Sequence, residues 1–247
     1  MASVAFAFAT LFRANGMLLS GFIAWSLVVA PFLRSHSVVR TPLNLRAKPL
    51  SILYAFILIG ICISPLLLHQ LHGYRQFCVP ATHEPPREWC DRAIPAIYSF
   101  VQAHYWNVGF LKYWRVDQIP NFLLASPPLF LLIYSAATTI RASLPHVVHG
   151  TMSVPRKAVT DKTDAINPRD IEILPHALHA LVMALILIFA SHTQIALRVV
   201  PTLPFMHWSV AGLFIQKPGP AKVWWMHWCV IWWAVSCVLW GAFLPPA

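Results

Sequence analysis

The stretch from Tyr98 to Ala125, YSFVQAHYWNVGFLKYWRVDQIPNFLLA, leads from an aromatic and polar segment through a proline into a hydrophobic run. A membrane-spanning helix requires mainly apolar residues, so the polar and aromatic side chains at the start of this run need another explanation. These side chains are Tyr105, Trp106, Asn107, Tyr113, Trp114, Gln118 and Asn121. The stretch therefore predicts a spanning helix with a specialised region at its mouth.

The composition of the whole chain supports a membrane protein. Its 247 residues are 58% hydrophobic and 11% charged, with a mean hydropathy of +0.62, which excludes an ordinary soluble protein. The formal net charge of +10 comes largely from basic residues in short segments between apolar runs. In such segments basic residues set the orientation in the membrane, so we expect no nucleic-acid partner.

The apolar runs predict an all-α, multi-span transmembrane protein, with about five spans plus one truncated helix. The predicted spans are residues 17–33, 50–71, 121–140, 174–199 and 223–243, preceded by a short apolar run at 2–12. Arg13, Asn15 and Gly16 separate the short run from the first span, which predicts a broken helix or a tight re-entrant turn. We expect residues 1–247 to form a single integral membrane domain.

The charges of the loops predict the orientation of the spans. Residues 34–48 contain arginines and a lysine but no acidic residue, so the positive-inside rule places this segment in the cytoplasm. By alternation, the loop at 72–118 is lumenal and the polar segment at 141–173 is cytoplasmic. Cys78 and Cys90 both lie in the lumenal loop, where an oxidising compartment would permit a disulfide between them.

Spacings of three or four separate Tyr98, Val101, Tyr105, Gly109 and Tyr113, which predicts an amphipathic helix over residues 97–115 in the membrane interface. Two interpretations stay open. The rings form a belt that anchors the protein, or they form a lumenal platform beside a glycolipid site. In the second interpretation rings pack on sugar faces and side-chain amides form hydrogen bonds. The candidates are Tyr105, Trp106, Asn107, Gln118 and Asn121.

Two further groups of polar residues are candidate binding residues. Arg13 with Asn15 stands at the first break, where an arginine either holds a lipid phosphate through its fork of donors or extends toward headgroups. His192, Gln194 and Arg198 fall at the lumenal end of the span predicted at 174–199. Ionisable groups within a span indicate function by default, here polar contact with a substrate head group.

Histidine pairs at helical spacing raise the question of a metal site. The pairs are His69 with His72, His146 with His149, and His176 with His179. No carboxylate stands among the intramembrane pairs and the loops scatter the pairs over both membrane sides, so we expect no metal. A histidine-based membrane oxidoreductase is thus a weak alternative. Signatures of soluble enzymes, such as a phosphate-binding glycine loop or HExxH, are missing from the sequence.

Several motifs resemble one known family. The segments EPPREWC at 84–90, IPAIYSFVQAHYWNVGFLKYW at 94–114 and QIPNFLLASP at 118–127 closely resemble the GPI mannosyltransferase 2 family of the PIG-V type. LFRANG at 11–16, HTQIALRVV from His192 and the closing FLPPA are similar to further segments of that family. The resemblance runs in order through the whole chain.

The resemblance implies part of a GT-C type glycosyltransferase fold in the membrane of the endoplasmic reticulum. Enzymes of this family add the second, α-1,6-linked mannose to the GPI anchor precursor. The implied partners are the GPI precursor glycolipid, the donor dolichyl phosphate mannose, membrane lipids and a small accessory membrane subunit. No cofactor is expected, because dolichyl phosphate is itself the leaving group. The resemblance further implies that Arg13 contacts phosphate, while the amides and rings named above shape the acceptor site.

The family carries its acidic catalytic motif, an aspartate after a tryptophan, in the loop that follows its first span. The present sequence matches the C-terminal part of the family pattern, so we expect that motif to lie N-terminal to these residues. Catalytic residues therefore stay unassigned within the chain. The alternative function is a catalytically inactive fragment or a non-enzymatic membrane subunit of GPI assembly.

Overall fold

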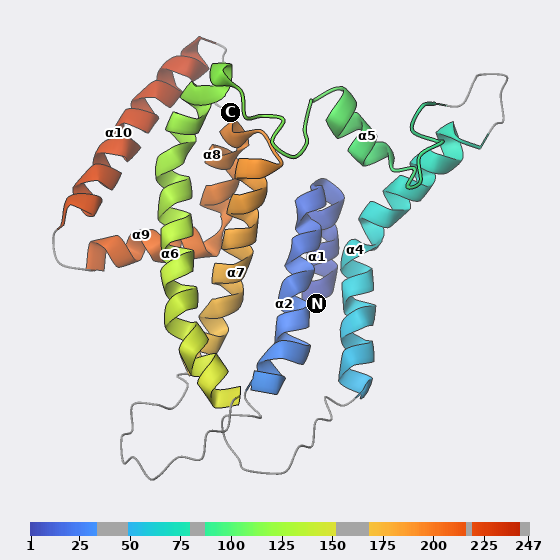
Figure 1. Ribbon diagram of the computed structural model, residues 1–247, viewed down its shortest axis with the longest axis horizontal. Helices are drawn as coiled ribbons and strands as arrows, with labels where there is room; N and C mark the ends of the chain where they lie inside the picture. The colour runs from blue at the N-terminus through green and yellow to red at the C-terminus, as the bar shows by residue number, and fades with distance from the viewer. Residues whose placement is uncertain (34–48, 80–86, 152–167, 216–218, 243–247) are drawn as a thin grey trace. The chain divides into compact units, whose positions relative to one another are not determined.

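The structure is a computed structural model that describes residues 1–33, 49–79, 87–151, 168–215 and 219–242. Within these ranges every regular element is a helix, and five segments are long and apolar enough to cross a membrane (Figure 1). These segments are Ala14–Leu33, Pro49–Phe77, Val116–Ser143, Glu172–Phe189 and Pro220–Gly241. The predicted all-α, multi-span fold is confirmed. The predicted cytoplasmic loop at 34–48 and residues 152–167 of the second one lie outside the described residues.

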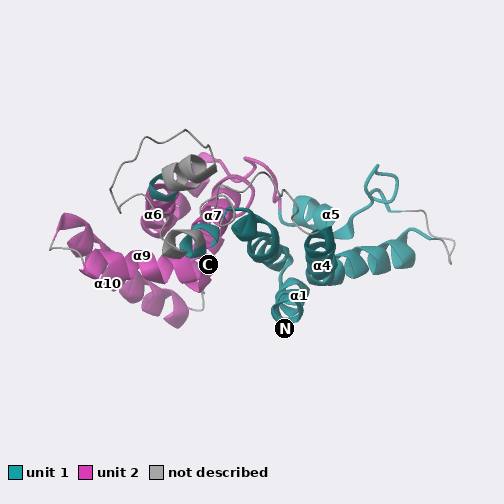
Figure 2. Cartoon of the chain, turned by 90° about the horizontal axis from the view of Figure 1, so that it is seen from below, with its two compact units in different colours: residues 1–106, 141–175 teal, residues 107–140, 176–247 magenta. Residues whose placement is uncertain are grey.

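The chain divides into two compact units, coloured teal and magenta in Figure 2. Unit 1 consists of residues 1–106 and 141–175, and unit 2 consists of residues 107–140 and 176–247. The opening stretch of the sequence thus contributes its first part to unit 1 and its second part to unit 2. The predicted single membrane domain stays a prediction.

Unit 1 begins with a helical hairpin. Helix α1 (Ala2–Phe12) is followed by a 3-10 helix (Ala14–Leu19), α2 (Ser20–Ala24) and a π-helix (Trp25–Val29). A Cβ atom on Gly16 would lie 2.5 Å from the backbone of Ala9 and Thr10, so only glycine lets the chain fold back this closely. The break predicted at Arg13 to Gly16 is therefore a tight re-entrant turn.

Helix α4 (Pro49–Phe77) packs against α1 through small side chains. Ser3 and Thr10 on α1 are buried, as are Ala55 and Cys62 on α4. Lipid tails are as apolar as the helices themselves, so close contact through small residues, rather than hydrophobic burial, stabilises such an interface. The Thr10 hydroxyl donates a 2.9 Å hydrogen bond to the Phe6 carbonyl, which satisfies this buried polar group.

Helix α5 (Ile97–His104) docks on the C-terminal part of α4 through two residues of α4. The backbone N–H of Tyr98 donates to Gln70 Oε1 at 3.1 Å, which satisfies one of the open donors at the start of α5. One turn further along α4, Gly73 leaves room for Ile97, whose Cγ2 would lie 2.8 Å from an added Cβ. These contacts fix where α5 leaves the spanning helix.

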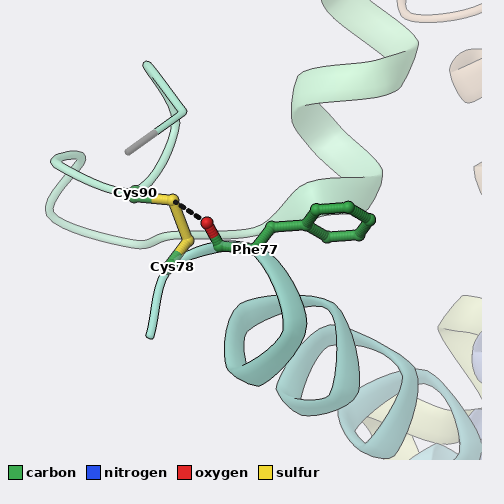
Figure 3. Close-up of a disulfide and its surroundings, with 3 residues drawn as sticks. All are labelled: Phe77, Cys78 and Cys90. Carbon is green, nitrogen blue, oxygen red and sulfur yellow. Dashed lines mark hydrogen bonds between the residues drawn. A yellow bond between two sulfur atoms is a disulfide. The ribbon is translucent and has the colours of Figure 1, made fainter. Parts of the chain in front are cut away.

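A disulfide between Cys78 and Cys90 closes the segment that joins α4 to α5 (Figure 3). Cys90 Sγ lies 3.7 Å from the Phe77 carbonyl oxygen, a close contact, because a disulfide sulfur carries no proton to donate. The neighbouring Trp89 is only 2% exposed and packs against Phe100 with ring centroids 6.5 Å apart. The disulfide segment thus supplies a small aromatic core beyond the spanning part of α4.

The amphipathic helix predicted over residues 97–115 is only partly correct, because the helix ends at His104. Asn107 and Leu111 have positive φ angles of 49° and 57°, a left-handed conformation that cannot continue a right-handed helix. Residues 105–115 instead form turns and bends, and from them the Trp114 ring stacks on Phe189 of α7.

Unit 2 contains most of α6 (Ile119–Thr151) and α7 (Pro168–Phe189), which run side by side in Figures 1 and 2. Both helices bury small residues at helical spacing: Ala125 and Ala136 on α6, and Ala177, Ala180 and Ala184 on α7. The span predicted at 174–199 is too long, because α7 ends at Phe189. The chain then turns through a 3-10 helix (Thr193–Ile195) into the short helix α8 (Ala196–Val199).

The cause of this early end is a polar segment that folds inward. Thr193 is fully buried, and its hydroxyl donates to the Leu187 carbonyl over 3.5 Å. After α8, a 3-10 helix (Val200–Thr202) leads to α9 (Pro204–Ile215), which is too short to span a membrane, and to the last span, α10 (Pro220–Gly241). No residue of α10 is buried, so this tryptophan-rich helix has the surface expected of a lipid-facing span.

Candidate functional site

The turn at Leu111 to Trp114 caps the C-terminus of α7. The last carbonyls of an α-helix have no partner within the helix. Leu111 N–H donates to the Phe189 carbonyl at 2.7 Å, and Trp114 Nε1 donates to the Ile188 carbonyl at 2.8 Å. The Trp114 ring also stacks on Phe189 and meets Phe122 of α6 edge-on. The turn is therefore attached to both long helices of unit 2.

A chain of hydrogen bonds between side chains follows this turn, and we name it the carboxylate-amide chain. Asp117 accepts from Arg115 Nε at 3.0 Å and from Gln118 Nε2 at 2.9 Å. Asn121 Nδ2 donates to Gln118 Oε1 at 2.8 Å and to Tyr113 Oη at 2.9 Å. Gln118 and Asn121 stand three residues apart around the start of α6, so both lie on one face of the helix.

Tyr113 ends the carboxylate-amide chain in a partly buried position. Its ring centroid lies 4.7 Å from that of His192 and 5.8 Å from that of Phe122. Burial is the main cause that raises the pKa of the Tyr113 phenol; the hydrogen bond from Asn121 opposes the shift, and the charge of Asp117 adds to it. Tyr113 is therefore a protonated phenol around neutral pH.

The structure brings some of the predicted binding residues of unit 2 together. Gln118 and Asn121 belong to the carboxylate-amide chain, and His192 joins it through the ring of Tyr113. Asn107 is exposed and does not belong to the carboxylate-amide chain. Its backbone has a left-handed conformation that asparagine tolerates better than most residues.

The polar stripe predicted from His192 to Arg198 is wrong as a feature of one spanning helix. His192 lies in the turn after α7, Gln194 in the 3-10 helix and Arg198 on α8, where its side chain is exposed. The side chain of Gln194 lies outside the described part of the structure. The early end of α7 separates these residues onto three elements.

The predicted residues of unit 1 occupy two places. Arg13 lies at the tip of the α1 hairpin in an extended conformation, with its N–H bonded to the Ala9 carbonyl and its own carbonyl accepting from Gly16 N–H. Its exposed side chain has no hydrogen bond or ion pair to any residue that the structure describes. Asn15 is partly exposed in the following 3-10 helix. Hydrogen bonds thus hold the backbone of the tip, while the described residues leave its guanidinium without a polar partner.

Tyr105 and Trp106 follow the end of α5 and are largely exposed, at 69% and 62%. The Tyr105 ring stands edge-on to His104, with centroids 4.8 Å apart. Exposed aromatic rings of this kind suit both the membrane interface and a sugar face, so the two interpretations made from the sequence both fit.

The sequence marks Tyr113 as an unusual side chain before the apolar run, but it does not predict the hydrogen bond from Asn121 to Tyr113 or the place of Asp117 in the carboxylate-amide chain. The spacing of Gln118 and Asn121 indicates that these two amides lie close together. It does not indicate the bond from Asn121 to Tyr113, because that bond depends on the turn at Leu111. Among the described residues no group of three or more histidines, cysteines, aspartates or glutamates is placed to hold a metal ion. His176, from one predicted pair, packs edge-on against Trp208.

Comparison with known proteins now defines the family. The profile of the family described as Mannosyltransferase (PIG-V) matches residues 1–247. GPI mannosyltransferase 2 of Chaetomium globosum is 31% identical over 100% of this chain and 51% of its own length. GPI alpha-1,6-mannosyltransferase 2 of Homo sapiens is 30% identical over 84% of this chain and 46% of its own length. GPI mannosyltransferase 2 of Aspergillus fumigatus is 37% identical over 66% of this chain and 35% of its own length.

The chain spans about half the length of the curated relatives that it matches. No solved structure matches it, so the GT-C type fold stays a prediction. The profile nevertheless covers every residue, and the relatives agree in their names. The chain therefore belongs to the PIG-V family of mannosyltransferases.

Proposed function

We propose that this chain acts in the transfer of the second, α-1,6-linked mannose to the GPI anchor precursor, with dolichyl phosphate mannose as donor, in the lumen of the endoplasmic reticulum. The observation that carries the proposal is the match of the PIG-V family profile to the whole chain. The name of the human relative, GPI alpha-1,6-mannosyltransferase 2, supports the linkage. A small accessory membrane subunit is part of the proposal.

The acceptor side of this reaction is assigned to unit 2. Sugars present neutral hydroxyl groups and apolar ring faces, which amides and aromatic rings recognise. The carboxylate-amide chain offers Asn121 and Tyr113 beside the rings of His192 and Phe122. Both Asp117 oxygens accept hydrogen bonds, from Arg115 and Gln118. Asp117 therefore suits an orienting role better than that of the base that deprotonates the acceptor hydroxyl.

The donor phosphate is assigned to Arg13. An arginine fork matches phosphate oxygens in a bidentate way, and the Arg13 side chain has no partner among the described residues that would compete. The departing dolichyl phosphate gains negative charge as the mannosyl bond breaks, so a cation that binds it more tightly at that stage favours the reaction. We propose no bound metal or cofactor for this step.

The test is complementation of cells that lack GPI mannosyltransferase 2 with the gene that encodes these residues. We expect surface GPI-anchored proteins to return with the natural protein. Asn121→Ala should reduce them, as should Asn107→Gly, which removes the amide but keeps the left-handed backbone. Gln76→Ala, which removes an exposed amide at the end of α4, is the matched control and should restore them fully.

A biochemical readout accompanies this test. Deficient cells should accumulate the precursor with one mannose, and the natural gene should convert it to the precursor with two. A natural protein that accumulates in the membrane but leaves the one-mannose precursor unconverted would reject the enzyme function and favour a non-enzymatic subunit. Full restoration by both site variants would remove Asn107 and Asn121 from the site.

A further inference from the structure

The hydrogen bonds of the carboxylate-amide chain are donated in one fixed direction, and Asp117 sets this direction. An ionised carboxylate only accepts hydrogen bonds, so Gln118 must turn its NH₂ group toward Asp117. The Gln118 oxygen is then left to face Asn121, which must present its own NH₂ group. Both contacts of Asn121 leave from Nδ2, so Tyr113 Oη receives a hydrogen bond from Asn121. The orientation of each amide follows from the charge at one end.

The direction of these hydrogen bonds decides where the phenolic proton of Tyr113 points. Because Tyr113 Oη is the acceptor toward Asn121, its own O–H must point elsewhere. Among the residues that the structure describes, Tyr113 makes no other hydrogen bond. The phenol is held by its ring contacts with His192 and Phe122, so the direction of this donor is restricted. A fixed, protonated donor without a described acceptor is suited to an incoming oxygen.

We propose that Tyr113 is a specificity-determining residue that donates its phenolic hydrogen bond to a hydroxyl oxygen of the acceptor sugar. This inference rests on the proposed function and names one contact within it. It gives the carboxylate-amide chain a purpose: Asp117, Gln118 and Asn121 are positioning residues that present the proton of Tyr113 to the acceptor.

The electrostatics favour a neutral sugar hydroxyl over a phosphate as the partner of Tyr113. The negative charge of Asp117 reaches the Tyr113 oxygen, because it helps to raise the pKa of the phenol. Arg115, which pairs with Asp117 at 3.0 Å, offsets part of this charge, so Tyr113 presents one neutral donor, which suits a sugar hydroxyl, whereas a phosphate is better bound by several donors or a cation. The binding of dolichyl phosphate mannose should thus not depend on Tyr113.

The experiment measures mannosyl transfer by membranes that contain the natural protein, with an acceptor glycolipid carrying one mannose and with its monodeoxy analogues. Tyr113→Phe removes the hydroxyl alone. We expect its KM for the acceptor to rise about fivefold to tenfold, the loss typical of one neutral hydrogen bond, while kcat and the KM for the donor stay within about twofold. The matched control is Tyr134→Phe, because Tyr134 is an exposed tyrosine on α6 that does not belong to the carboxylate-amide chain.

The monodeoxy acceptors identify the contact itself. One analogue should bind the natural enzyme as weakly as the complete acceptor binds Tyr113→Phe. That variant should not discriminate further against the same analogue, because the partner of the missing hydroxyl is already gone. A variant that merely loosened the fold would instead lose affinity for every analogue alike.

Asp117→Asn is the second variant, and it leaves Tyr113 intact. An amide at position 117 both donates and accepts, so it no longer fixes the direction of the amides, and the KM for the acceptor should again rise with the KM for the donor unchanged. It decides the question if Tyr113→Phe does not accumulate. Unchanged acceptor KM in these variants, or a raised donor KM, overturns the role of Tyr113 while the proposed function stands. A natural protein without transfer activity overturns both.

Discussion

The hairpin tip at Arg13 to Gly16 and the turn at Leu111 to Asn121 both present polar groups beside spanning helices, but they are built in opposite ways. Backbone contacts hold the tip: Gly16 packs on Ala9 and Thr10, while the Arg13 side chain contacts no described partner. Side chains hold the turn, through Trp114 and Asn121. In the tip, stability and the proposed phosphate binding therefore belong to different residues. In the turn, the same residues serve both.

The largest expected effect is at Gly16. Gly16→Val adds a side chain where even a Cβ would lie 2.5 Å from backbone atoms, which cannot move aside as a flexible side chain can. We expect a loss of roughly 3 kcal/mol or more in the free energy of unfolding, or failure to accumulate in the membrane. Thermal unfolding in detergent measures it.

Gly21→Ala is the matched control for this change. No atom lies within 4 Å of a Cβ built on Gly21, and alanine favours a helix over glycine by about 0.5–1 kcal/mol. The control should therefore keep or slightly raise the midpoint of unfolding. If Gly16→Val had the same midpoint of unfolding as Gly21→Ala, the tip would not be held by close backbone packing.

The second effect is at Arg13 and should appear in binding alone. Arg13→Gln should raise the KM for the dolichyl-phosphate donor about tenfold to a hundredfold, because a hydrogen bond to a charged group is lost. Arg13→Lys keeps the charge but not the fork and should fall between the natural protein and Arg13→Gln. The midpoint of unfolding should stay unchanged, since the exposed side chain makes no hydrogen bond or ion pair with a described residue. A lowered midpoint with an unchanged donor KM would contradict the separation of stability and binding at this tip.

A smaller effect is expected at Trp114, where stability and binding should change together. Trp114→Phe keeps an aromatic ring beside Phe189 but removes the donor to the Ile188 carbonyl. Since Trp114 is half exposed, water replaces part of this bond, and the loss should be about 1 kcal/mol. The KM for the acceptor should rise in parallel. Trp224→Phe on exposed α10 is the control, and an equal effect there would show that the cap is unimportant.

The smallest effect concerns pH. Burial raises the pKa of Tyr113, so its phenol keeps its proton to a higher pH than an ordinary tyrosine does. Only above that pH does Tyr113 lose the O–H group that donates the hydrogen bond. The ratio of acceptor KM between Tyr113→Phe and the natural protein should thus stay constant between about pH 6.5 and 9. A ratio that fell toward one within this range would show that the phenol ionises there and that its burial is not maintained.

Much of the fold follows from local sequence. Five apolar runs predict the five spans, and Arg13, Asn15 and Gly16 predict a broken helix or a tight re-entrant turn, of which the structure shows the turn. These predictions succeed because length and composition decide whether a helix can cross a bilayer. The two wrong helix bounds, at 97–115 and 174–199, fall where contacts between distant residues decide the structure.

The candidate site shows the same limit. Gln118 and Asn121 are predicted as candidates because a spanning helix does not need amides at its start, and amides can form hydrogen bonds with a sugar. Tyr113 stands out in the same way, but its hydrogen bond with Asn121 was not predictable, since the turn that places it is held by the bond from Trp114 to the Ile188 carbonyl, across 74 residues of sequence. The spacing of Tyr98, Val101, Tyr105, Gly109 and Tyr113 resembles that of a helix, although beyond His104 the chain forms turns and the Trp114 ring stacks on Phe189 of α7.

The most direct test of the acceptor site is photo-crosslinking to the natural protein in membranes. The probe is the one-mannose acceptor glycolipid with a photoreactive group on its mannose. We expect the label on the peptide that contains residues 107–121, and we expect excess unmodified acceptor to prevent it. Label on α10 alone, or label on 107–121 that excess acceptor does not reduce, would contradict the assignment of the acceptor to the carboxylate-amide chain.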